Sequence, residues 1–114
     1  MESCVFCKII KGDIPCNKVY EDDLVFAFDD IHPMAPVHFL VVPKIHIPTL
    51  MDMLPEHANI LLALCKAVQM IARNKDVAET GFRTVINCGD EGGQIVPHLH
   101  IHILGGVRLK DDLG

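Results

Sequence analysis

The chain has 114 residues, the size of one small domain, so the span 1–114 is predicted to fold as a single unit. Its formal net charge is −5 and it contains no cluster of lysine and arginine, which argues against a protein that follows a nucleic-acid backbone. No stretch approaches the roughly 20 apolar residues of a membrane span, so no membrane partner is expected.

The cysteines and the N-terminal residues both bear on the cellular compartment. Residues 1–30 contain no positively charged segment followed by an apolar run of secretory-signal length. The five cysteines are odd in number and lack the spacing of a disulfide scaffold. Together these features predict a cytoplasmic protein with reduced thiols.

Residues 4–11 place apolar side chains in pairs one helical turn apart, which predicts a short helix. Ser3 is expected to cap its start and Gly12 to end it. Cys4 and Cys7 form a C-x-x-C, which in a cytoplasmic chain is typical of half a zinc site or of a redox pair. A redox pair of the thioredoxin type follows a strand, and no strand is expected before Cys4, so the zinc site is favoured.

The next part of the chain alternates strand and turn signals before one long helix. Residues 18–21 and 24–28 resemble strands on either side of an Asp-Asp turn, which predicts a hairpin. A loop punctuated by prolines then leads into a continuous apolar strand, 39–42. Pro55 suits the first turn of a helix, with Asp52 placed to cap it.

The predicted long helix has an apolar stripe that is wider than one core face requires. The stripe consists of Ile60, Leu61, Leu64, Val68 and Ile71, broadened by Leu62, Cys65 and Ala72. It is either a wide core face or partly a dimer surface. Further strands are predicted at 82–87 and 98–104. Most strands are joined by connections too short for a parallel crossover, so an α+β fold with an antiparallel sheet is expected.

The last predicted strand holds three of the seven histidines, His98, His100 and His102, alternating with apolar residues. On a strand these imidazoles share one face while the apolar residues enter the core. Such a row suits metal ligands, a nucleophile with neighbours that position it, or simply a polar face. The glycine-rich loop at 87–94 just before it can hold a phosphate on backbone N–H groups, which favours a functional role.

Residues 93–102, Gly-Gln-Ile-Val-Pro-His-Leu-His-Ile-His, resemble the signature of the histidine-triad (HIT) family. The Leu-Gly-Gly at 104–106 resembles its Hint-like branch, the histidine triad nucleotide-binding proteins. Similar segments at 21–23, 28–31 and 37–44 extend the resemblance over about residues 4–106. It implies a HIT-like fold, a five-stranded antiparallel sheet with two helices, and a homodimer.

The resemblance also implies a hydrolase. Such an enzyme cleaves a nucleoside 5′-phosphoramidate, or a related nucleotidyl ester or anhydride, to a nucleoside monophosphate such as AMP, without an organic cofactor. His100 matches the nucleophile that forms a nucleotidyl-histidine, and imidazole is a good nucleophile when it is neutral. His102 matches the histidine that contacts the phosphate and the leaving group. His98 supports the site, and His38 matches a histidine near the triad.

Residues that contact a purine nucleotide follow from the same resemblance. Asp30 matches an acid that binds the ribose hydroxyls. The positions around the phosphate are Asn87, Gly93 and Gln94. The positions around the base are Val5, Phe6, Ile9, Phe28 and Ile31, for which core packing is the alternative. Ile95 departs from the Ser, Thr or Glu of many relatives near the leaving group.

A structural zinc is the second implication. Some relatives bind zinc through a C-x-x-C, a histidine after the Pro-Lys loop and the first triad histidine, and all four positions are present as Cys4, Cys7, His46 and His98. A closed set of two cysteines and two histidines suits a structural ion rather than a catalytic one.

The sequence is also compatible with two other functions. The chain is alternatively a nucleotide-binding or interaction module with little catalysis, which turnover of an adenosine phosphoramidate would distinguish. It is alternatively a cupin-type metal protein that chelates through an H-x-H, which needs a further ligand on another strand and metal-dependent activity.

Overall fold

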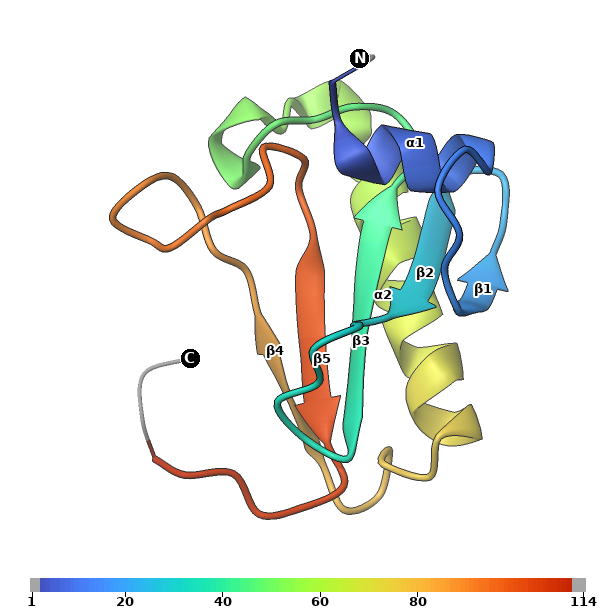
Figure 1. Ribbon diagram of the computed structural model, residues 1–114, viewed down its shortest axis with the longest axis vertical. Coiled ribbons are helices and arrows are strands. Elements are labelled where there is room, and N and C mark those ends of the chain that lie inside the picture. Colours follow the sequence, from blue (N-terminus) through green and yellow to red (C-terminus); the bar gives the residue numbers. More distant parts are fainter. Residues whose placement is uncertain (1–2, 112–114) are drawn as a thin grey trace.

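The computed structural model describes residues 3–111, which form one sheet with a helix on each face (Figure 1). The elements in chain order are α1 (Val5–Lys11), β1 (Lys18–Glu21), β2 (Val25–Asp29), β3 (Val37–Pro43), two short 3-10 helices (Leu50–Asp52 and Pro55–His57), α2 (Ala58–Asn74), β4 (Phe82–Val85) and β5 (Ile101–Gly105). The predicted α+β fold, with five antiparallel strands and two helices, is confirmed.

The strands are arranged in the order β1-β2-β3-β5-β4, and every neighbouring pair is antiparallel. β1 and β2 form the predicted hairpin. β3 is buried along most of its length, on both of its faces. Its apolar residues follow one another without intervening polar ones, which is typical of a strand covered on both sides. β5 pairs with both β3 and β4, which places the histidine-bearing strand inside the sheet rather than at its edge.

The two helices cover opposite faces of this sheet, with α2 behind it and α1 across its upper end in Figure 1. Val41 packs in the main core together with the apolar side of α2, whereas Leu40 and Val42 pack with Phe6 of α1. Residues paired across antiparallel strands share a face, and His102 pairs with Leu40. His102 therefore lies on the α1 face of the sheet.

Helix α1 is capped by Cys4, not by Ser3, so that prediction is wrong by one residue. The Cys7 backbone N–H donates to the Cys4 sulfur at 3.4 Å, and the thiol thus takes the place of a capping hydroxyl. Gly12 ends the helix as predicted, with φ +89°, a conformation that glycine adopts without a steric penalty.

Helix α2 begins at Ala58, three residues later than the proline signal predicts. Pro55 starts a 3-10 turn instead, and Asp52 lies in the 3-10 helix before it, so neither begins nor caps α2. The buried side of α2 consists of Ile60, Leu64, Ala67, Val68, Ile71 and Ala72. Leu61 and Leu62 are 49% and 57% exposed, so the wide stripe is a core face with an exposed apolar margin.

Strand β5 begins at Ile101, three residues later than predicted. The backbone before it is bonded elsewhere, since the N–H of His98 donates to Val96 O at 2.8 Å and that of Leu99 to Ile47 O at 2.7 Å. His98 and His100 therefore both lie on an irregular segment that joins the glycine loop to the strand, and His102 is the triad residue within β5. Among residues 3–111, no helix has the length and apolar character needed to cross a membrane.

Candidate active site and metal-binding cluster

The imidazoles of the three triad histidines lie on one side of the chain, as predicted, and this is the side that α1 covers. The Phe6 ring of α1 meets His98 and His100 edge-on, with ring centroids 5.8 and 5.0 Å away. The rings of His100 and His102 are themselves 5.0 Å apart. The intervening residues enter the core under α2, and these are Leu99, Ile101 and Ile103.

The tautomer of His100 is defined by a backbone carbonyl. Its Nδ1 lies 2.7 Å from the carbonyl oxygen of His98, and this contact is buried. A carbonyl oxygen only accepts, so Nδ1 carries the ring proton and the lone pair of Nε2 is free. A neutral imidazole with a free nitrogen lone pair is the form that a nucleophilic histidine needs.

A second imidazole pair lies beside the nucleophile. His38 Nε2 is 3.0 Å from His102 Nδ1, and the backbone N–H of Met34 donates to His38 Nδ1 at 3.0 Å. Burial lowers the pKa of His38, partly opposed by Asp30. Burial and the neighbouring His100 and His38 lower the pKa of His102 to about 4, again partly opposed by Asp30. Both rings are therefore neutral at pH 7.

Asp30 faces this pair from the loop after β2. Its Oδ2 lies 3.4 Å from His38 Nε2, and its Oδ1 accepts the backbone N–H of His32 at 2.8 Å. The carboxylate is thus held beside the histidines by the turn of its own loop. Its predicted contact with the ribose hydroxyls stays a prediction.

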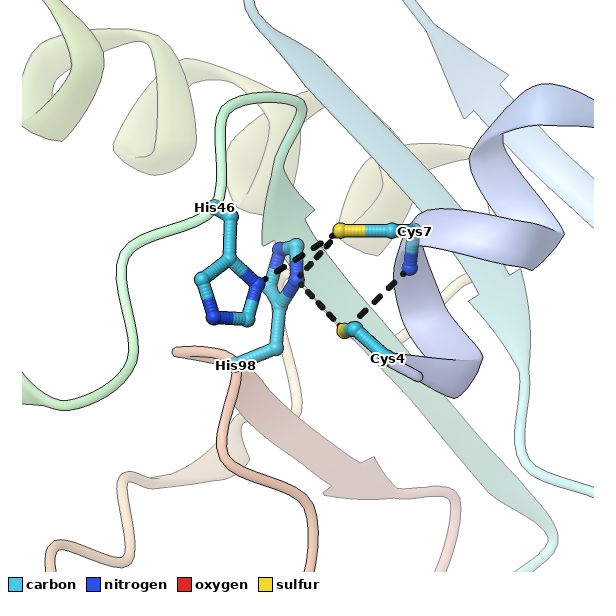
Figure 2. Close-up of side chains that lie close together, drawn as sticks. All are labelled: Cys4, Cys7, His46 and His98. Atoms are coloured by element: carbon cyan, nitrogen blue, oxygen red, sulfur yellow. Dashed lines mark hydrogen bonds between the residues drawn. The ribbon is translucent and has the colours of Figure 1, made fainter. Parts of the chain in front are cut away.

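The four predicted zinc ligands converge at one point (Figure 2). Cys4 Sγ lies 3.3 Å from His98 Nδ1, and Cys7 Sγ lies 3.5 Å from His46 Nδ1 and 3.6 Å from His98 Nδ1. A tetrahedral zinc with Zn–S of ~2.3 Å and Zn–N of ~2.05 Å needs S···N separations of roughly 3.6 Å. The four groups already have nearly the spacing that such an ion requires.

The protonation of His98 also fits a metal ligand. Its ring is fully buried, and its Nε2 donates to the carbonyl of Pro43 at 2.9 Å. That hydrogen bond leaves the Nδ1 lone pair facing the two sulfurs, which is the usual arrangement of a metal-bound histidine and its carbonyl partner. Burial is the main cause that lowers the pKa of His98, so the ring is neutral as ligation requires.

The glycine loop before the triad is held by Gln94. The carboxamide oxygen of Gln94 accepts the Gly89 N–H at 3.0 Å, and its NH₂ donates to Pro48 O at 2.7 Å and Val96 O at 3.0 Å. A Cβ on Gly92 would lie 2.4 Å from the Cys88 carbonyl oxygen, so only glycine fits there.

The predicted phosphate residues all lie on this loop or at its start. Asn87 donates to the carbonyl of Gly92 at 2.8 Å, and Gly93 has φ +78°. The side chains of Asn87 and Gln94 are thus both bonded to loop backbone. Their contact with a phosphate stays a prediction.

The residues predicted to surround the base divide into two groups. Phe6 and Phe28 are buried and pack edge-on with ring centroids 5.5 Å apart, so they belong to the small core under α1. Ile9 is half-buried at the margin of this core, whereas Val5 and Ile31 are 37% and 80% exposed. The side chains of this second pair are therefore accessible from solvent.

Two hydrogen-bonding groups of this site could not be predicted from the sequence, because both belong to the backbone. The Met34 amide holds His38, and the Pro43 carbonyl holds His98. The structure reveals both because it brings strand β3 and its preceding loop against the triad.

Comparison with known proteins gives the same family. The HIT domain family matches residues 11–109. The chain is 46% identical over 108 residues to the purine nucleoside phosphoramidase of Escherichia coli K12, covering 95% of this chain and 91% of that protein. It is 51% identical over 108 residues to an uncharacterized HIT-like protein of Synechococcus elongatus, covering 95% and 94%. A histidine triad protein from Clostridium difficile superimposes with a TM-score of 0.95 at 47% identity, covering 99% of this chain and 98% of that one.

This chain belongs to the HIT family. The predicted family and fold are thereby confirmed, and so, at this coarse level, is the predicted class of a HIT family hydrolase.

Proposed function

We propose that this protein is a nucleoside phosphoramidase that cleaves purine nucleoside 5′-phosphoramidates, or related nucleotidyl esters and anhydrides, to a monophosphate such as AMP. The observation that carries the proposal is the buried bond from His100 Nδ1 to the His98 carbonyl, which leaves Nε2 free to attack. The name of the Escherichia coli relative supports the same reaction class.

The proposed reaction has two displacements. In the first, a bond forms between His100 Nε2 and the α-phosphorus while the phosphorus–nitrogen bond breaks. The leaving nitrogen keeps the electron pair and takes up one proton, supplied by solvent, so that it departs as a neutral amine. The imidazole gains positive charge in this step, and the His98 carbonyl stabilises that charge through the Nδ1 proton. In the second, a water oxygen attacks the phosphorus while the bond to His100 Nε2 breaks, the water gives up a proton to solvent, and the neutral imidazole and the monophosphate are released.

Substrate contacts are proposed from the placement of the predicted residues. Asp30 binds the ribose hydroxyls, and the glycine loop with Asn87, Gly93 and Gln94 surrounds the phosphate. The base lies against the α1 side of the sheet. The residues proposed to line it are Val5, Phe6, Ile9, Phe28 and Ile31.

Turnover of adenosine 5′-phosphoramidate, followed as AMP release by chromatography, tests the proposal. The wild type is expected to turn over, and a sample quenched in alkaline denaturant, in which a phosphorus–histidine bond survives, is expected to carry one nucleotidyl group. His100→Ala is expected to lose at least ~10³-fold in kcat while it still binds AMP. Cys65→Ala, at an exposed position on α2, is the control. Activity of His100→Ala within about tenfold of the control contradicts the mechanism.

We also propose that Cys4, Cys7, His46 and His98 hold a structural zinc. The convergence of the four groups within 4.8 Å of one another supports it. An ion there ties α1, the segment after β3 and the segment that leads into β5 at a single point. All four positions are then filled by the protein, which suits a structural site and leaves the reaction to His100.

We further propose one domain over 1–114, a homodimer and a cytoplasmic location. Leu61, Leu62 and Met70 are exposed apolar residues of α2, and β4 lies at the end of the strand order. An apolar margin and a sheet edge are both features that a second copy covers. Light scattering at micromolar concentration tests the dimer, and a monomer contradicts it.

The free cysteines support the proposed cytoplasmic location, because thiols stay reduced in that compartment.

The two alternative functions are weaker. A cupin-type chelate needs the rings of His98 and His100 to face one ion, but His98 Nδ1 faces the two sulfurs and His100 Nδ1 faces a carbonyl. A binding module with little catalysis predicts that AMP binds equally well to the wild type and to His100→Ala while neither turns over.

A further inference from the structure

The ring proton of His38 can be placed from two independent neighbours. The Met34 N–H donates to Nδ1 at 3.0 Å, and a backbone amide has no lone pair with which to accept. Asp30 presents a carboxylate oxygen, which only accepts, 3.4 Å from Nε2. A neutral imidazole between such neighbours carries its single proton on Nε2.

The placement of that proton decides the tautomer of His102. His38 Nε2 is 3.0 Å from His102 Nδ1, so the His38 proton points at this nitrogen and requires its lone pair. A neutral His102 must then carry its own proton on Nε2. His100, whose ring centroid is only 5.0 Å away, has the opposite arrangement, with its proton on Nδ1.

We propose that the Met34 amide, acting through His38, locks His102 as a hydrogen-bond donor at Nε2 and thereby restricts the nucleophile to His100. The lock rests on the proposed function for its catalytic meaning, since the donor faces the phosphate and leaving group only if that reaction occurs here. His38 is a positioning residue in this scheme and does not contact the substrate.

Two backbone groups thus give neighbouring imidazoles opposite roles. The His98 carbonyl exposes a lone pair on His100, and the Met34 amide exposes an N–H on His102. Without the lock, both tautomers of His102 become accessible, and one of them has a lone pair at Nε2 in place of the N–H, so it cannot donate a hydrogen bond to the leaving group as the phosphorus–nitrogen bond breaks. The lock therefore affects the rate of the chemical step more than the affinity for the nucleotide.

The first test needs no substrate. Long-range ¹H–¹⁵N spectra of the wild type, free and with AMP, report which nitrogen of each histidine is protonated. The expected result is a proton on Nε2 of His38 and His102 and on Nδ1 of His100. A proton on Nδ1 of His102 overturns the lock, as does zinc bound through His38 and His102, because Asp30, His38 and His102 also lie within metal-ligand range. Failure of the proposed function appears separately, as a wild type that does not turn over.

The second test uses matched variants and adenosine 5′-phosphoramidate. Met34→Pro removes the amide proton, and Met34→Ala, which keeps it and trims an exposed side chain, is its reference. His38→Leu removes both hydrogen bonds, whereas the carboxamide of His38→Gln can accept from Met34 and donate to His102. Met34→Pro and His38→Leu are expected to lose roughly tenfold in kcat relative to Met34→Ala and His38→Gln, with KM within about threefold.

Substrates with different leaving groups sharpen this comparison. The aryloxide of an aryl ester of AMP leaves without a proton donor. The loss in kcat that Met34→Pro causes should therefore be several-fold smaller for this ester than for the phosphoramidate, whose leaving group is an amine. Equal losses for both substrates, or a His38→Gln variant as slow as His38→Leu, overturn the proposal. If a variant does not fold, as shown by circular dichroism, the wild-type spectra still decide it.

Discussion

Replacing Cys7 with serine is expected to cost the protein its zinc and a large part of its thermal stability. Cys7 Sγ lies 3.5 Å from His46 Nδ1 and 3.6 Å from His98 Nδ1, so serine removes the sulfur ligand that is near both histidine ligands. An ion that binds only the folded state, present at a free concentration 100 times its Kd, stabilises that state by about 2.7 kcal/mol. For 114 residues at about 2.1 cal/mol/K each, the unfolding entropy is roughly 0.24 kcal/mol/K. The Tm difference is then about 11 °C.

Calorimetry measures this difference on zinc-loaded and chelator-treated protein, with elemental analysis of the same samples. Cys65→Ser is the matched control, because Cys65 is exposed on α2 and outside the cluster. It is expected to retain about one zinc per chain and the full zinc-dependent shift. Turnover per folded molecule should change less than stability in Cys7→Ser, since the His98 carbonyl that holds His100 is a backbone group. A wild type that binds no zinc, or whose Tm does not respond to it, refutes the reasoning.

Three further results are expected. The pKa of His102 is lowered to about 4 in the folded state from a usual ~6.5, so between these pH values the unfolded chain binds more protons than the folded one. The free energy of unfolding should therefore fall as pH is lowered from about 6.5 to 4. Urea unfolding with chelator present measures this fall, which should be smaller in His102→Gln. Gln94→Met, which removes the three hydrogen bonds of the Gln94 carboxamide, should speed hydrogen exchange of the Gly89 amide and raise KM. An unchanged exchange rate would show that these bonds do not hold the glycine loop. Leu61→Glu with Leu62→Glu should shift light scattering from dimer to monomer, and an unchanged mass places the interface elsewhere.

The pattern of apolar and polar residues predicts most of the sheet, because the pattern is local. The alternation around the triad separates its imidazoles from the core residues Leu99, Ile101 and Ile103, and the structure has the same division. The ends of elements are less well predicted. β5 begins late because the N–H of Leu99 donates to Ile47, a partner some fifty residues earlier that no local signal reveals.

The four zinc ligands show what sequence motifs do and do not specify. The C-x-x-C indicates that Cys4 and Cys7 lie on one side of a short helix, and the helix confirms it. The distances to His46 and His98 depend on how α1, the segment after β3 and the segment that leads into β5 pack together. Hydroxyl groups are the common helix caps, which predicts Ser3 as the cap of α1, yet the Cys4 sulfur takes that place.

The sequence by itself determined the family, the order of strands and helices, and the residue types of the site, because these depend on side-chain chemistry and on periodicity over a few residues. Only the tertiary structure decided where the protons are. The tautomer of His100 depends on the His98 carbonyl and that of His102 on His38 and the Met34 amide. Every residue except proline has the same backbone amide, so no residue identity records which amide meets which imidazole; that is decided when the loop before β3 folds against the triad.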